Sequence, residues 1–161
     1  MPSTEQGADD RARRDIATYR RAVESHPDSA AACNSLAWAY STAPEHLRDP
    51  DRALALALRA TELAPDDPAI RNTLGVAYYR AGRYREAADT LRINLAGQRE
   101  KFLGADLYFL AMSHHRLGEE ALARAYYTWA NRVRRPHDEL SAEELQERAA
   151  FRAEAEILMG K

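Results

Sequence analysis

The strongest constraint in this sequence is an internal repeat. The segment 74–87 (LGVAYYRAGRYREA) aligns without a gap to the segment 110–123 (LAMSHHRLGEEALA), 36 residues further on. Leu36 lies 38 residues before Leu74, and Ala53 lies 34 residues before Ala87, so the series extends backwards. The first copy therefore holds about four extra residues, in the turn STAPEHLRDP. A period of this length is typical of proteins in which one unit cannot bury its apolar face alone and stacks on its neighbours.

Helix signals recur along the chain, and strand signals are almost absent. Asp67 and Pro68 have the types expected of an N-cap and a first helical residue, whereas Gly82 stands where a helix should stop. Ser141 and Glu144 have the spacing of a capping box. The sequence predicts eight helices, at about 9–25, 29–41, 50–63, 68–81, 84–97, 104–117, 119–133 and 141–158.

Composition favours a single cytoplasmic domain. With 161 residues, of which 45% are hydrophobic, the chain is long enough to bury an ordinary core. Cys33 is the only cysteine, so no internal disulfide can form, and its apolar neighbours favour a buried packing role over a reactive one. No signal peptide and no apolar run of membrane-spanning length is evident.

The repeated helix pairs resemble the tetratricopeptide repeat (TPR), whose pattern is W-x2-L-G-x2-Y in one helix, then A-x3-F and a closing proline in the second. Asn94 and His114 depart from it, where alanine and tyrosine are usual, and Arg99 stands near a proline position. The resemblance implies an all-α, right-handed TPR α-solenoid of three helical hairpins, with an N-terminal half-repeat helix and a C-terminal capping helix. The predicted segments are a disordered leader at 1–8, a TPR domain at 9–137 (half-repeat 9–28, repeat one 29–66, repeat two 67–102, repeat three 103–137) and the capping helix at 138–161.

Small residues recur at one position of each predicted hairpin. Gly75 costs an interior helix about 0.5–1 kcal/mol relative to alanine, so a compensating interaction is expected. In TPR proteins this position allows neighbouring helices to approach closely, and packing energy offsets the cost. The equivalent positions are Ala37, Gly75 and Ala111 on the first helices, and Ala53, Ala87 and Ala123 on the second.

The resemblance also implies a concave groove, lined by the first helix of each hairpin, that binds a peptide or protein segment. Two equivalent residues, Asn34 and Asn72, either bond an extended peptide or bond locally within the helix pair. Trp38 and Tyr108 either pack internally or anchor a ligand. The predicted groove residues are Asn34, Trp38, Asn72, Val76, Tyr79, Tyr108, Met112 and His115.

Other function classes find little support in the sequence. His114 and His115 are adjacent in a helix and point about 100 degrees apart, so they cannot chelate one metal from the same face. No metal, phosphate-loop or nucleophile motif occurs. Acidic residues interleave with the arginines, and the isoelectric point is near 6.2, which disfavours nucleic-acid binding. We therefore predict no enzyme activity, no catalytic or metal site, no cofactor, no membrane contact and a protein partner.

A narrower resemblance is to bacterial TPR modules that often follow eukaryotic-like serine/threonine kinase domains. This chain carries neither an HRD nor a DFG motif. If the likeness matters, the chain is a detached accessory module or a regulatory or scaffolding fragment of such a signalling protein. Met1 and the polar residues after it favour a complete short protein.

The last predicted helix has two alternative roles. Its apolar residues follow helical spacing, which implies a partner surface. They are Ala142, Leu145, Ala149 and Ala153, with Phe151, Ala155 and Leu158 widening the stripe at its far end. Capping of the solenoid by packing on Leu122, Tyr126 and Val133 of the preceding helix is favoured. The alternative is a helix that folds back into the groove as a built-in blocker.

Overall fold

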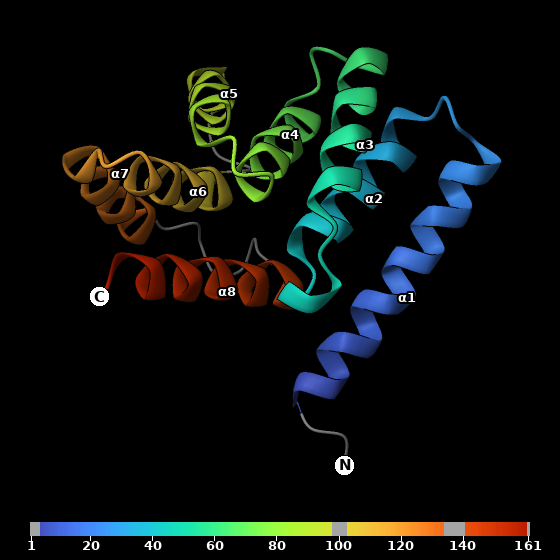
Figure 1. The fold of residues 1–161 in the computed structure, drawn as a ribbon, viewed down its shortest axis with the longest axis horizontal. Coiled ribbons are helices and arrows are strands. Elements are labelled where there is room, and N and C mark those ends of the chain that lie inside the picture. The colour runs from blue at the N-terminus through green and yellow to red at the C-terminus, as the bar shows by residue number, and fades with distance from the viewer. Residues whose placement is uncertain (1–3, 98–102, 134–140, 161) are drawn as a thin grey trace. The chain divides into compact units, whose positions relative to one another are not determined.

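The computed structural model describes residues 4–97, 103–133 and 141–160, and within these the fold is all-α, without a strand (Figure 1). The α-helices are α1 Thr4–Ser25, α2 Ala30–Thr42, α3 Pro50–Leu63, α4 Pro68–Arg80, α5 Tyr84–Gly97, α6 Leu103–Arg116, α7 Glu120–Arg132 and α8 Ala142–Met159, with a short 3-10 helix η1 Glu45–Leu47. The eight predicted helices are confirmed, with ends that differ mostly by one residue.

The first helix differs from its prediction, because it begins at Thr4 and not near residue 9. Residues 4–8 are therefore helical and not part of a disordered leader. Near its N-terminal end, at a residue already within the predicted range, this helix has a tertiary contact: Nε2 of His46, in η1, lies 2.7 Å from Oδ2 of Asp9. That contact joins the inserted turn between α2 and α3 to the first helix, and no local sequence pattern predicts it.

Helix ends follow local chemistry. Ser29 and Asp67 cap α2 and α4 by accepting bonds from the backbone N–H groups of Ala32 and Ala69, at 3.2 and 2.8 Å. Gly82 and Gly118 adopt positive φ angles of 76° and 74°, which glycine tolerates best. The capping box at the start of α8 is present as predicted.

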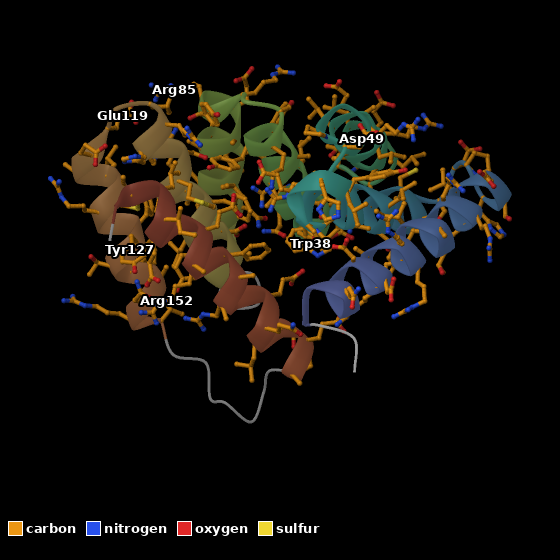
Figure 2. The ribbon with its side chains drawn as sticks, turned by 60° about the horizontal axis from the view of Figure 1, so that its bottom comes forward. Trp38, Asp49, Arg85, Glu119, Tyr127 and Arg152 are labelled. Carbon is orange, nitrogen blue, oxygen red and sulfur yellow. The ribbon has the colours of Figure 1, made fainter. Side chains whose placement is uncertain are left out.

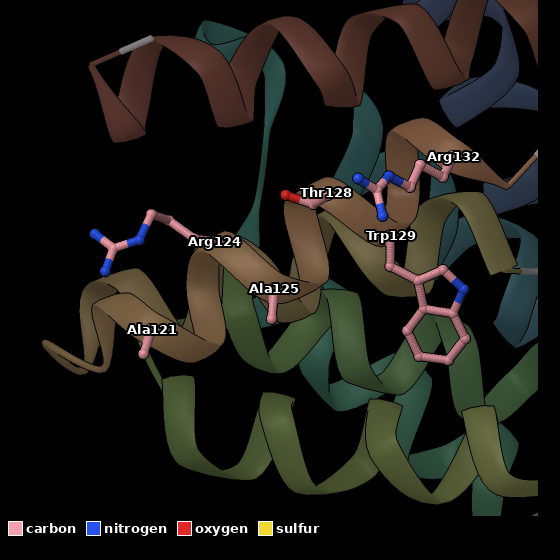
Figure 3. A pocket seen from close by; sticks show the side chains of 6 residues that line it. All are labelled: Ala121, Arg124, Ala125, Thr128, Trp129 and Arg132. Carbon is pink, nitrogen blue, oxygen red and sulfur yellow. The ribbon is translucent and has the colours of Figure 1, made fainter.

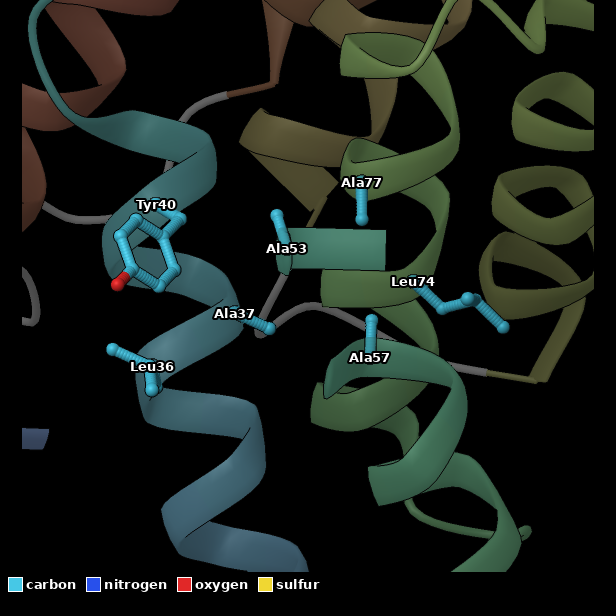
Figure 4. Packing of buried hydrophobic residues seen from close by; sticks show 7 residues of the cluster. All are labelled: Leu36, Ala37, Tyr40, Ala53, Ala57, Leu74 and Ala77. Carbon is cyan, nitrogen blue, oxygen red and sulfur yellow. The ribbon is translucent and has the colours of Figure 1, made fainter. Parts of the chain in front are cut away.

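Contacts within the chain define two compact units, Met1–Gly82 and Arg83–Lys161. In the N-terminal unit, α2 and α3 form a hairpin, α1 packs on α2, and α4 packs on both α2 and α3. Alanine occupies the contact positions Ala37, Ala53 and Ala57, which are fully buried, and so the helices approach closely. Figure 4 shows the cluster Leu36, Ala37, Tyr40, Ala53, Ala57, Leu74 and Ala77.

The C-terminal unit is built around α6, which packs against α5, α7 and α8. Every residue from 106 to 114 is buried, so this helix is covered on all sides. The boundary between the units falls at Gly82, inside the segment 67–102 predicted as repeat two, because α4 packs on α2 and α3 whereas α5 packs on α6. The predicted repeat boundaries stay a prediction.

The small residues behave as the repeat pattern predicts. Ala37, Ala111, Ala53, Ala87 and Ala123 have no exposed surface, and Gly75 is buried within α4. Cys33 is buried as well, and burial raises the pKa of its thiol, which disfavours the reactive thiolate.

Candidate functional site

Five of the eight predicted groove residues lie in the N-terminal unit, on α2 and α4. On α2, Asn34, Trp38 and Ser41 follow one another at steps of four and three residues, so they share one face. Asn34 and Trp38 are half-buried (Figure 2 labels Trp38), and Ser41 is buried. Neither Oδ1 of Asn34 nor Oγ of Ser41 has a hydrogen-bond partner among the described residues. Unpaired polar atoms cost folding free energy that a ligand could recover.

The α4 residues form a buried wall beside this face. Asn72, Val76 and Tyr79 are all buried, and α4 packs on α2. Arg80 ends the wall: its Nε donates to the Ser41 carbonyl oxygen at 2.8 Å, and its guanidinium lies 5.6 Å from the centre of the Tyr79 ring. Of the five predicted groove residues of this unit, Asn34 and Trp38 thus keep more accessible surface than Asn72, Val76 and Tyr79.

The other three predicted groove residues lie on α6, in the C-terminal unit. Tyr108 and Met112 are fully buried, and His115 is half-buried. The Tyr108 hydroxyl donates to Oδ1 of Asn131 at 3.0 Å, and burial raises the pKa of this phenol. Nδ1 of His115 lies 2.7 Å from Oε1 of Glu120. Tyr108 is thus hydrogen-bonded within its own unit, and His115 lies beside a carboxylate of that unit.

The C-terminal helix lies against α6 and not against the predicted surface of α7. Phe151 packs edge-on against Phe109, with ring centres 5.0 Å apart. Of the predicted partners, Leu122 remains 46% exposed, whereas the carbonyl oxygen of Val133 accepts a bond from Arg148 of α8. The capping role of this helix stays a prediction. Within the predicted apolar stripe, Phe151 and Ala155 are buried, whereas Ala149 and Ala153 are exposed.

Polar bonds fix the position of α8. One terminal nitrogen of Arg148 donates to the carbonyl oxygens of Ala130 and Val133, at 2.9 and 2.7 Å. Near the other end, Glu156 accepts bonds of 2.8 Å from both the Tyr127 hydroxyl and Arg152 (Tyr127 and Arg152 are labelled in Figure 2). These bonds lower the pKa of Glu156, with Arg152 the larger cause. Arg148 bonds the end of α7, so the apolar and the polar contacts of α8 involve different helices.

The adjacent histidines bond different carboxylates. Nδ1 of His114 lies 2.5 Å from Oε2 of Glu119, and Arg85 donates to the other oxygen of Glu119 at 2.8 Å (Figure 2). These two bonds lower the pKa of Glu119, with His114 the larger cause. The His114 ring is buried and stacks on Tyr126 at 5.3 Å. Among the described residues no group of three or more His, Cys, Asp or Glu side chains could hold a metal ion.

Sequence reasoning overlooked the partners of these histidines. Glu119 and Glu120 each lie beside a histidine five residues earlier, across the turn at Gly118. The recurrence of histidine and glutamate on both sides of Gly118 in HHRLGEE was the available signal.

Comparison with known proteins supports the repeat interpretation. Residues 47–101 match the tetratricopeptide repeat family. Two similar solved structures are MamA AMB-1 (25% identity, TM-score 0.59, covering 73% of this chain and 66% of that chain) and MamA MSR-1 (25% identity, TM-score 0.58, covering 74% and 66%). No curated protein matches the sequence significantly. The chain thus contains a TPR-like segment within a fold similar to that of MamA.

None of the described helices is both long and apolar enough to cross a bilayer.

Proposed function

We propose that this protein is a non-catalytic protein–protein interaction module that binds an extended segment of a partner on the α2 face of its N-terminal unit. The TPR match and the MamA-like fold support the general class, because stacked helical repeats present extended binding surfaces. The observation that carries the specific site is the α2 face itself. There the half-buried Trp38 lies between Asn34 and Ser41, each of which has one buried oxygen without a hydrogen-bond partner among the described residues.

Binding at this face uses simple chemistry. The Asn34 amide nitrogen can donate a bond to a peptide C=O, so it recognises backbone without requiring a particular sequence. The Trp38 indole offers a large apolar contact with little rotamer freedom to lose. The buried α4 residues Asn72, Val76 and Tyr79 support the face from behind. The α6 residues Tyr108, Met112 and His115 stay a prediction for a longer ligand.

Peptide selection followed by substitution tests this proposal. Extended peptides are selected on the full chain from a displayed library, and their affinity is measured by titration calorimetry. Trp38→Ala and Asn34→Ala should each weaken binding by about 1–2 kcal/mol. The control is Arg59→Ala on α3, whose guanidinium makes only exposed ion pairs with Asp28 and Glu62. Affinities that are equal for the three variants and the unmodified chain would reject the α2 face.

A further inference from the structure

A second accessible surface lies on α7, in the C-terminal unit. Six residues project from one side of this helix at steps of three, one, three, one and three positions, and so they form a continuous stripe of about three turns. They line a shallow hollow of about 440 Å³ (Figure 3). The stripe consists of Ala121, Arg124, Ala125, Thr128, Trp129 and Arg132.

Trp129 is the one aromatic residue of the stripe, and it is exposed beside the small residues Ala125 and Thr128. Its side chain is 45% exposed, although tryptophan is usually well buried. The indole stacks on Tyr126, with ring centres 6.4 Å apart, and Tyr126 stacks in turn on the buried His114 ring. Because this series of rings holds the indole in place, a ligand that covers Trp129 loses little side-chain entropy on binding.

Two arginines flank the apolar part of the stripe. Neither Arg124 nor Arg132 has a carboxylate partner among the described residues, whereas Arg85 and Arg92 of the same unit are paired. The two guanidinium groups project from Cα atoms about 12 Å apart along the helix axis, since they are eight residues apart. The stripe therefore combines an apolar centre with two positive charges that no carboxylate of the described residues pairs with.

We propose that this face of α7 is a docking site for an amphipathic helix of a partner protein that carries carboxylates about two turns apart on either side of an apolar side chain. Ala121, Ala125 and Thr128 are small enough for a second helix to approach closely. The apolar side chain of the partner covers Trp129, and its carboxylates pair with Arg124 and Arg132. This site goes beyond the proposed peptide face, since it lies in the other unit and binds a helix and not an extended segment.

A second copy of this chain fits the surface less well. Pairing of two α7 helices through this stripe would place four arginines, two from each copy, in one interface without a carboxylate of the stripe to neutralise them. Like charges in contact destabilise such an interface. An acidic partner has no such repulsion, and so charge complementarity selects between the two occupants.

Helical peptides and matched variants test the docking site. A displayed library of helical peptides of about 16 residues, random at its polar positions, is selected on the full chain. Selected peptides should carry Asp or Glu seven or eight residues apart and should bind more weakly as salt rises. By fluorescence anisotropy, Trp129→Ala should weaken binding at least about tenfold, with Trp129→Phe in between. The double change Arg124→Glu and Arg132→Glu should abolish binding.

The controls separate this surface from the proposed α2 face. The double change Arg59→Glu and Arg92→Glu alters net charge equally at exposed ion pairs outside the stripe, so binding should persist. Trp38→Ala should leave helix binding unchanged, just as Trp129→Ala should leave extended-peptide binding unchanged. The docking proposal is rejected if no peptide is enriched, if the enriched peptides are neutral or basic, or if Trp129→Ala has no effect. Self-association that Trp129→Ala abolishes would assign the surface to a second copy.

Discussion

Nδ2 of Asn94, on α5, donates a 2.9 Å hydrogen bond to Oδ2 of Asp106, on α6, and both side chains are buried. This bond joins two helices at a position where the TPR pattern usually has alanine. A buried carboxylate is tolerated only where donors compensate for its lost hydration. The departure from the repeat pattern at Asn94 therefore supplies a donor to Asp106.

Asn94→Ala should lower the free energy of unfolding by about 1–3 kcal/mol, because a buried carboxylate loses a donor. Chemical denaturation of the two single variants and of the double variant Asn94→Ala, Asp106→Ala measures the coupling between them. We expect the double variant to be more stable than the sum of the two single losses predicts. Strict additivity would show that the two side chains act independently.

Glu119→Gln should destabilise the protein in a pH-dependent way. The bonds from His114 and Arg85 lower the pKa of Glu119 in the folded state, and an unfolded glutamate has a pKa of about 4.3. Ionised Glu119 therefore stabilises the fold above about pH 4.3, and this contribution disappears as pH falls through the lower folded pKa.

Denaturation midpoints of the two proteins, measured from neutral to acid pH, test this dependence. The gap between them should be largest near neutral pH and should close in acid. The control is Glu24→Gln, which alters an exposed and long ion pair with Arg20 and should have little effect at any pH. A gap of constant size would assign the effect of Glu119 to packing and not to charge.

Phe151→Ala should loosen the C-terminal helix and cost about 3–5 kcal/mol, because the substitution leaves a cavity against Phe109. The matched control on the same helix is Ile157→Ala, at a position that is 83% exposed, with an expected change within about 0.5 kcal/mol. Urea denaturation measures both. Equal effects would mean that α8 does not depend on this contact in solution.

Ala111→Leu should destabilise the protein by about 1–3 kcal/mol through overpacking, since Ala111 is fully buried on α6. Ala149→Leu makes the same change at an exposed site on α8, and we expect a change within about 0.5 kcal/mol. Thermal melts followed by circular dichroism compare the two. A tolerated leucine at Ala111 would show that neighbouring helices leave room at this position.

The sequence predicted the elements of the fold because the relevant signals are local. Caps such as Asp67 and the glycine at 82 act on backbone groups a few residues away. Period and residue size likewise predicted that Ala111 and its equivalents are buried. The candidate site was less predictable. The resemblance indicated which helix faces line a groove, but it did not indicate which side chains on them stay accessible. Of the eight predicted residues, only Asn34, Trp38 and His115 are half-buried, and the other five are buried.

The sequence by itself thus determined the helices, their ends and the small residues between them, since each depends on neighbours along the chain. The tertiary structure alone decided that α8 packs on α6, that Asn94 bonds Asp106 and that Trp129 stays exposed. These are relationships between segments that lie apart in sequence. An apolar helix face indicates that the helix packs on another surface, but it does not indicate which of several apolar surfaces that is. Packing against Phe109 and the bonds of Arg148 to the end of α7 together select one of them.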